Sequence, residues 1–170
     1  MKKILVISIM AAFALASNAA NKRMMENATI VADTIYYDAN RMNVADRSDA
    51  SYYRLLLKAG KGQQKQDMFQ DFYLNGSLKA EGGYSFIDLG NDNNTKVDGE
   101  VTTYYPNGKE KWRGQFANGR PNGYFTMQMR DGSIAVAEFV NGKSKFDYFT
   151  VTRPDGTIQR HSINELDSLL

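Results

Sequence analysis

The chain of 170 residues carries 21 basic and 19 acidic side chains, a single histidine and no cysteine. A chain without cysteine forms neither disulfides nor thiolate metal sites, and a nearly balanced charge gives no electrostatic basis for binding nucleic acid. Its length suits one domain, or one short solenoid, with a core of its own.

The N-terminus has the three parts of a secretory signal peptide. Lys2 and Lys3 are basic, an apolar run follows at residues 4–15, and small residues occupy positions 16–20. The run is shorter than the roughly 20 residues of a membrane-spanning helix, and no cysteine follows it that could carry a lipid anchor. We therefore expect residues 1–20 to be removed, leaving no transmembrane span, a net charge near zero and a secreted or periplasmic protein.

Residues 21–66 are predicted to supply strands that pack on the main sheet or extend it. Residues 34–37 (TIYY) and 51–59 (SYYRLLLKA) are rich in aromatic and aliphatic side chains, which is typical of strands. Residues 42–44 can continue the sheet, and the polar residues 45–50 can form one helical turn.

From residue 67 to residue 162 the sequence repeats itself. Blocks of ten residues start 24 residues apart at 99–108 (GEVTTYYPNG), 123–132 (GYFTMQMRDG) and 147–156 (DYFTVTRPDG), and another copy, 67–76 (DMFQDFYLNG), lies 32 residues upstream. Each block is a strand-like run closed by Asn-Gly or Asp-Gly, which reverses the chain. The longer spacing is explained by one insertion, residues 87–98, which is predicted to be a surface loop.

These features predict an all-β fold, an antiparallel meander of stacked β-hairpin repeats that form an elongated curved sheet. A hairpin of this size cannot bury its apolar side alone, so neighbouring hairpins must stack. Ser162 and Glu165 have the spacing of a capping box and precede Leu166. Residues 163–170 are therefore predicted to form a short helix that caps the last hairpin.

Alternation along the blocks predicts which side of each strand is buried. The third position of every block is apolar and is assigned to the packed face: Phe69, Val101, Phe125 and Phe149. The fourth position is polar and is assigned to solvent: Gln70, Thr102, Thr126 and Thr150.

The turns leave the strand register open. A two-residue turn at residues 131–132 would pair Met127 with Val136 on the packed face, and we favour it there. Pro106 and Pro154 instead favour three-residue loops, because proline cannot donate in the closing pair of a two-residue hairpin. A change of one residue reverses the faces of a strand, so the sequence does not decide whether Trp112 is buried.

Residues 104–123 (YYPNGKEKWRGQFANGRPNG) resemble the MORN-variant repeats of bacterial proteins, and residues 34–56 are similar to a leader that precedes such repeats in secreted proteins. The resemblance implies a scaffold for protein or lipid contact rather than a catalyst, although such families often carry an antitoxin label that implies an intracellular partner. It assigns structural roles to the turn residues Asn107, Gly108, Asn118, Gly119 and Gly123. The pattern is incomplete, because Glu138 and Asp147 stand where the motif has glycine.

The residues that could carry chemistry are few, and no catalytic residue, cofactor or metal site is predicted. His161 has neither a cysteine nor a second histidine with which to form a metal site or a nucleophilic pair. The loop acids Asp88, Asp92 and Asp98 invite a calcium hypothesis, but Lys96 occupies a ligand position of the EF-hand frame.

The predicted binding face consists of Tyr104, Tyr124 and Tyr148, which lie opposite the packed face and could grip an extended strand or a glycan by stacking. The alternative is that residues 34–59 cover them as a second layer. We expect a non-catalytic scaffold that binds an unidentified protein of the cell envelope. A carbohydrate-binding or weakly hydrolytic protein would need a groove with two carboxylates about 5–10 Å apart, and peripheral lipid contact is the third hypothesis.

Overall fold

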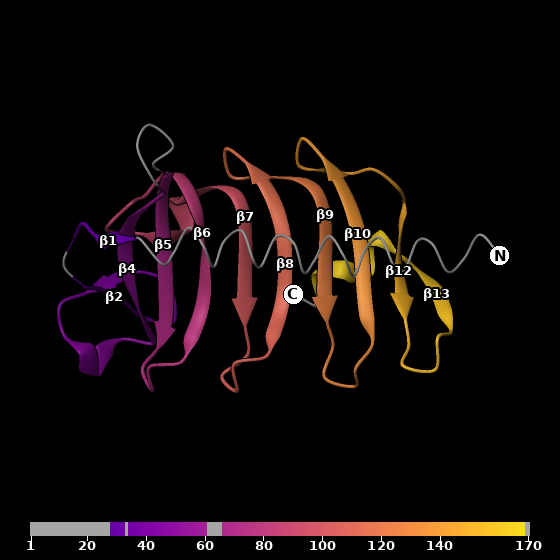
Figure 1. Cartoon of the computed structure of the whole chain (residues 1–170), viewed down its shortest axis with the longest axis horizontal. Coiled ribbons are helices and arrows are strands. Elements are labelled where there is room, and N and C mark those ends of the chain that lie inside the picture. The colour runs from indigo at the N-terminus through magenta and orange to yellow at the C-terminus, as the bar shows by residue number, and fades with distance from the viewer. Residues whose placement is uncertain (1–27, 33, 61–65, 169–170) are drawn as a thin grey trace.

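The computed structural model describes residues 28–32, 34–60 and 66–168, so the expected signal peptide lies outside the described residues. The described chain forms one antiparallel sheet of 13 strands in the order β13-β12-β10-β9-β8-β7-β6-β5-β4-β2-β3, with β1 on β4 and β11 on β10. The sheet is open, and its strands follow one another along the long axis of the molecule (Figure 1). The predicted all-β meander of hairpins is confirmed.

The first part of the chain extends this sheet at one end. Its elements are β1 (Thr29–Ile30), β2 (Ile35–Tyr37), β3 (Asn43–Val44), the single 3₁₀ turn η1 (Arg47–Asp49) and β4 (Tyr52–Ala59). β2 and β4 fall where strands were predicted, and η1 falls in the segment predicted to form one helical turn. β1 was missed because two residues are too few to show a periodicity.

The repeats supply the rest of the sheet. Their strands are β5 (Gln66–Tyr73), β6 (Leu78–Phe86), β7 (Lys96–Tyr104), β8 (Glu110–Ala117), β9 (Arg120–Gln128), β10 (Ile134–Val140), β11 (Lys143–Ser144), β12 (Tyr148–Thr152) and β13 (Ile158–Ser162). Two 3₁₀ segments complete the described chain, η3 (Asp92–Asn94) in the insertion and η4 (Ile163–Ser168) after β13.

The turn after β9 differs from the favoured prediction. Met129 N donates to Ser133 O at 2.8 Å, and Gly132 N donates to Met129 O at 3.1 Å, which is a three-residue loop. Met127 therefore pairs with Ala135, and the predicted Met127–Val136 pair is wrong by one residue. The longer loop forms because the Asp131 carboxylate accepts the Ser133 amide at 2.9 Å while Gly132 takes a φ of 85°.

The other three blocks close with the same loop, including the two with proline. After the first two loops, the ladders between β5 and β6 and between β7 and β8 shift by one residue at a bulge. The bulge pairs Trp112 with Thr103, on the same side of the sheet as the third-position residues. Trp112 is half-buried there, which settles the face that the sequence left open.

The second turns of the repeats are two-residue Asn-Gly turns with positive φ at both residues, 50° and 78° at Asn118 and Gly119. Each of these turns is hydrogen-bonded to the first strand of the hairpin that precedes it. Asn118 N donates to Asp98 Oδ1 at 2.9 Å and Gly119 N to Val97 O at 2.7 Å. One repeat later the corresponding bonds join Asn141 N to Asn122 Oδ1 at 3.1 Å and Gly142 N to Pro121 O at 2.8 Å.

The packed face carries two apolar clusters that meet at Trp112. One consists of Met127, Ala135, Ala137, Phe149, Val151 and Leu166, and the other of Leu56, Phe69, Ala80 and Val101. Trp112 packs against both. Phe125 lies over Gly114, where a side chain would come within 2.4 Å of the ring. The predicted third-position core is confirmed, with Phe125 half-buried.

The opposite face, here called the polar face, is less open than predicted. Thr102 is buried, with 1% of its surface exposed, and Gln70, Thr126 and Thr150 are half-buried. Thr102 lies in the ladder between Glu81 and Arg113, whose longer side chains rise on both sides of it. The prediction that this column faces solvent is therefore wrong for Thr102, because a short side chain in the middle of a wide sheet is shielded by its neighbours.

The last hairpin is capped as predicted, by a 3₁₀ rather than an α-helical segment. Glu165 Oε1 accepts the Ser162 amide at 3.2 Å, as in a capping box, and Ser162 Oγ accepts the amide of Asn164 at 3.4 Å. Leu166 is buried in the apolar cluster of the packed face. Residues 169–170 of the predicted helix lie outside the described residues.

Candidate functional site

The three predicted tyrosines lie on the polar face but do not form one surface. Tyr104 is half-buried, and its hydroxyl donates to Glu81 Oε1 at 2.7 Å. Burial and this bond to a carboxylate raise the pKa of Tyr104 above its ordinary value. Tyr104 is thus part of a polar network within the sheet, and the prediction that it belongs to an open binding surface is wrong.

Tyr124 is the most exposed of the three, with 61% of its surface accessible. It stands opposite Glu138 in the ladder between β9 and β10. Glu138 Oε1 forms an ion pair with Lys145 Nζ at 2.8 Å, and this hydrogen bond raises the pKa of Lys145. The Lys145 ammonium also lies 5.5 Å from the centre of the Phe146 ring.

Tyr148 continues the same series of contacts toward the end of the sheet. Its ring stacks on Phe146 with 5.4 Å between centroids, and the guanidinium carbon of Arg160 lies 4.5 Å from its centre. Phe146 is 44% exposed. We name this surface the C-terminal patch, which comprises Tyr124, Lys145, Phe146, Tyr148 and Arg160. The sequence repeat predicted Tyr124 and Tyr148, whereas Lys145 and Phe146 stand outside the ten-residue blocks, at positions that Pro121 and Asn122 occupy one repeat earlier.

The strand β13 lies beside this patch and forms one edge of the described sheet. All its residues except His161 are exposed. The bonds at its two ends show which of its main-chain groups point toward β12. Arg153 N donates to Thr157 O at 2.8 Å, and Ile163 N donates to Asp147 O at 2.9 Å. In an antiparallel ladder these groups alternate, so the main-chain groups of Ile158 and Arg160 point away from β12.

At the opposite end of the sheet, the insertion at residues 87–98 covers the edge strand β3. Asn43 N donates to Gly90 O and Asp92 N donates to Arg41 O, both at 2.9 Å, and Met42 forms an isolated bridge with Asn91. The prediction of a simple surface loop is wrong in this respect, because the loop closes the short edge strand β3 and inserts a side chain into the interior. A covered edge resists pairing with other strands.

That inserted side chain is Asp92, which belongs to a buried ionic network. Arg54 forms a bidentate pair with Asp71, at 2.6 and 2.8 Å, and a further ion pair with Asp92. Asp92 also accepts hydrogen bonds from Tyr52, at 2.7 Å, and from Arg41, at 2.9 Å. The side chains of Arg54, Asp71 and Asp92 are 1–4% exposed.

The environment changes the ionisation of this network. Burial by itself would raise the pKa of Asp92, but Arg54, the Tyr52 hydroxyl and Arg41 together lower it to about 2. At Asp71 burial prevails over Arg54 and raises the pKa above its ordinary value. Burial lowers the pKa of Lys79, whose ammonium lies 4.0 Å from the centre of the Tyr52 ring.

The three loop acids of the calcium hypothesis serve separate partners. Asp88 Oδ1 accepts the amides of Gly90 and Asn91, Asp92 belongs to the buried network, and Asp98 holds the Asn118 turn. Among residues 28–32, 34–60 and 66–168 no three His, Cys, Asp or Glu side chains are grouped so that they could hold a metal ion.

His161 has a packing role. Its ring stacks on Phe149 with 5.4 Å between centroids, and its Nδ1 lies 3.3 Å from Glu165 Oε2. It therefore helps to hold η4 against the last hairpin.

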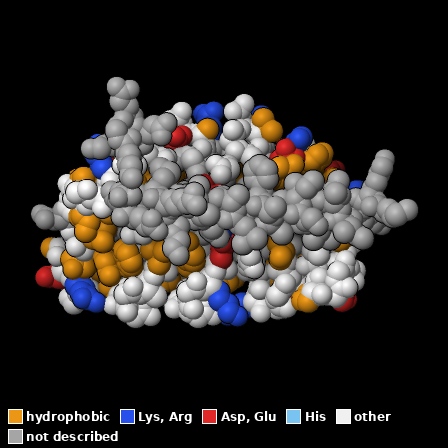
Figure 2. Space-filling view, viewed as in Figure 1, with side chains coloured by type: hydrophobic (Ala, Val, Ile, Leu, Met, Phe, Trp, Pro, Cys, Tyr) orange, Lys and Arg blue, Asp and Glu red, His pale blue; other side chains and the backbone are white. Residues whose placement is uncertain are grey.

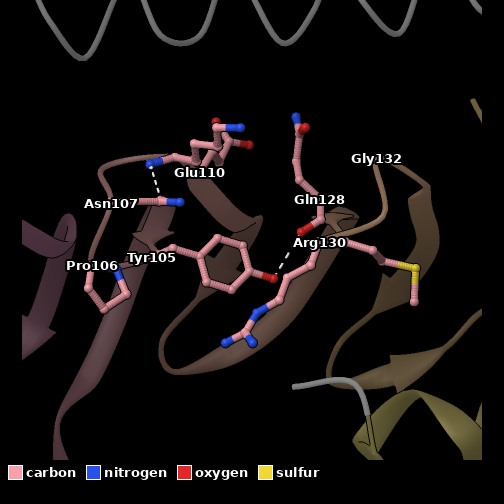
Figure 3. A pocket seen from close by; sticks show the side chains of 9 residues that line it. Tyr105, Pro106, Asn107, Glu110, Gln128, Arg130 and Gly132 are labelled. Atoms are coloured by element: carbon pink, nitrogen blue, oxygen red, sulfur yellow. Dashed lines mark hydrogen bonds between the residues drawn. The ribbon is translucent and has the colours of Figure 1, made fainter.

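A hollow of about 750 Å³ separates the β7–β8 turn from the β9–β10 turn (Figure 3). The Tyr105 side chain reaches across it, and its hydroxyl donates to Gln128 O at 3.1 Å, while Arg130 lies 5.7 Å from its ring centre. These contacts tie consecutive repeats together at the turn edge of the sheet.

A second aromatic group lies at the other end of the molecule. Tyr36, Tyr53 and Phe72 contact one another across β2, β4 and β5, with ring centroids 6.2 and 5.2 Å apart. Hydrophobic side chains gather over this end of the sheet in Figure 2. The three rings are half-buried, however, and each covers part of its neighbour. The C-terminal patch is the more accessible surface.

Comparison of the chain with family models, curated proteins and solved structures gives no match. The likeness of residues 104–123 to MORN-variant repeats therefore stays a prediction. Within the described residues, no helix has the length and apolar character needed to cross a membrane.

Proposed function

We propose that the protein is a non-catalytic interaction scaffold of the bacterial cell envelope and that the C-terminal patch binds a partner protein there. The observation that carries the proposal is the exposure of Tyr124 and Phe146, 61% and 44%, beside the cationic side chains of Lys145 and Arg160. Aromatic residues and arginine are enriched at the centres of protein interfaces.

The arrangement of the patch favours a preformed surface. Tyr148 is held by Phe146 on its ring and by Arg160 above it, and Lys145 is held by Glu138. Rings that are already ordered lose little conformational entropy on binding. A partner with apolar and acidic side chains would match the rings and the two cations of this surface.

A non-catalytic role is supported by what the ionisable side chains already do. His161 packs on Phe149, Glu81 accepts the Tyr104 hydroxyl, and Glu138 is paired with Lys145. A general acid or base must be able to reach a substrate proton, and these groups are used within the fold. The signal-like N-terminus supports the envelope location.

Site-specific photocrosslinking in the source cells tests this function. A photoreactive phenylalanine analogue is placed at Tyr124 in the full chain, and Leu89 serves as the matched control because it is 55% exposed at the far end of the sheet. We expect one discrete protein adduct from position 124 and none from position 89. Replacing both Phe146 and Tyr148 by Ala should remove that adduct while far-ultraviolet circular dichroism stays unchanged.

Two results would contradict the proposal. Equal adducts from positions 89 and 124 would mean that the surface is not selective. The absence of any protein adduct at position 124 would remove the partner-binding role.

A further inference from the structure

The edge strand β13 has the features of a strand that lacks its neighbour. The other returning strands of the repeats, β6, β8 and β10, are each paired on their outer side by the first strand of the next repeat. β13 is the returning strand of the last repeat, and no described strand follows it. Within the described residues, its outward main-chain groups therefore have no neighbouring strand, whereas those of its counterparts are paired.

The free part of this edge is short and well defined. Within the described chain, Ile158 and Arg160 direct both amide and carbonyl outward, while the outward amide of Ser162 is taken by Glu165 Oε1 at 3.2 Å. At the other end the edge stops at the Gly156 turn, where Gly156 N donates to Arg153 O. Ile158 and Arg160, two residues apart on the strand, are thus available for pairing with another strand.

A head-to-tail arrangement is disfavoured, because the opposite end of the described sheet offers only β1 and β3, with two residues each, and β3 is covered by the insertion. Pairing through the same edge on each copy instead gives a closed two-fold arrangement. We propose that β13 pairs antiparallel with β13 of a second copy and that the two sheets become continuous. This self-association uses the main chain of β13 and goes beyond the partner binding assigned to the C-terminal patch.

Charge selects the register of that pairing. A pairing centred on Arg160 would place two guanidinium groups directly opposite each other, which destabilises a sheet. A pairing centred on Gln159 instead sets Ile158 of each copy opposite Arg160 of the other and satisfies both outward amides and carbonyls. The two Arg160 side chains are then diagonal neighbours, so a weaker repulsion remains and is screened by salt.

The paired surface is small. Two strands of five residues bury far less than the roughly 1,600 Å² of a standard interface, so the dimer is expected to form only as the protein concentration rises. Analytical ultracentrifugation of the purified protein from low micromolar to near-millimolar concentration measures this. The expected result is a monomer that converts to a dimer, more readily at high ionic strength.

Two substitutions at Arg160 give opposite predictions. Arg160→Pro removes the outward amide without removing a bond to β12, and edge strands tolerate proline where the amide faces solvent. It should abolish the dimer. Arg160→Thr keeps the main chain and removes the repulsion, so it should tighten the dimer several-fold. Because Arg160→Pro could impair folding, Ile158→Pro at the first residue of the strand is the second variant, and circular dichroism checks both.

The proposal is overturned if the protein stays monomeric throughout the range, if the dimer survives both proline variants in folded form, or if Arg160→Thr weakens it. The crosslink from position 124 should persist in the folded Ile158→Pro variant, which leaves every residue of the C-terminal patch in place. If the otherwise wild-type protein gives no crosslink from position 124, the partner-binding function of the C-terminal patch is refuted, but the pairing of β13 is not.

Discussion

At the scale of single residues, Arg54 is the side chain on which the N-terminal end of the sheet depends. It compensates two buried carboxylates and lies 4.5 Å from the centre of the Phe69 ring. Removing one partner of a buried ion pair costs more than the pair itself contributes, because the remaining charge stays in a region without water. Arg54 is therefore more important for stability than its place in an apolar strand suggests.

We expect Arg54→Met to lower the free energy of unfolding by about 3–5 kcal/mol. Urea denaturation followed by circular dichroism measures the change. Lys58→Met on the same strand is the matched control, because the Lys58–Asp67 pair is about half exposed and such pairs contribute little. Similar effects of the two substitutions would show that the network does not stabilise the fold.

Asp92 gives the network a dependence on pH. Its pKa of about 2 in the folded protein lies below the ordinary value of 3.8, so ionised Asp92 stabilises the fold above pH 3.8 and loses this contribution as the pH falls through 2. The shift corresponds to about 2 kcal/mol. Unfolding curves of the wild type and Asp92→Asn should differ by a constant amount near neutral pH and converge in this acidic window. A difference that does not change between neutral pH and the acidic window would contradict the assignment.

At the scale of elements, the four block-closing loops depend on a glycine with positive φ. Gly108 has a φ of 79° and nothing within 4 Å of the position of a side chain, so a substitution there tests backbone strain alone. Gly108→Ala should destabilise the protein by about 1 kcal/mol, whereas Gly90→Ala should not, because Gly90 lacks a positive φ. Thermal denaturation of both variants decides this, and equal melting temperatures would refute the strain argument.

The elements also show what the sequence could reveal. The block repeat, the two faces and the Asn-Gly turns were predictable because they are encoded within about ten residues. The loop length after Met129 was not, since Asp131 and Gly132 are compatible with two- and three-residue loops and the choice depends on the Ser133 amide. The bulge that places Trp112 shifts the pairing of β7 and β8 by one more residue, and no local sequence pattern encodes that shift.

The site was less predictable than the fold. The bond between Arg54 and Asp92 joins residues 38 apart in the chain, and the loop that carries Asp92 has a polar composition typical of surface. The signal that could have revealed it was an arginine inside an apolar strand together with Asp71, two residues after Phe69 and therefore on the packed face. In the C-terminal patch, the repeat led to Tyr124 and Tyr148 but also to Tyr104, because sequence spacing does not show that Glu81 accepts the Tyr104 hydroxyl.

At the scale of the whole molecule, Trp112 joins two cores that otherwise belong to different ends of the sheet. In repeat proteins the coupling between neighbouring units makes unfolding cooperative. We expect Trp112→Ala to separate the unfolding of the two ends, so that amide exchange in β4–β6 and in β9–β12 no longer responds to urea together. Met129→Ala, which touches only the C-terminal cluster, should keep a single transition. A single unfolding transition for both ends of the sheet in Trp112→Ala would show that the two ends are coupled through the main chain and not through Trp112.

The hydrogen bonds between each Asn-Gly turn and the first strand of the preceding hairpin also restrict how the number of residues in such a chain can change. Asp98 and Asn122 occupy equivalent positions 24 residues apart, and each holds the turn that follows its own hairpin. Duplication or deletion of one complete unit keeps every such bond together with its partner. An incomplete unit separates a turn from the side chain that binds it. A change of length by whole hairpins is therefore compatible with these bonds, whereas a change by part of a unit breaks one of them.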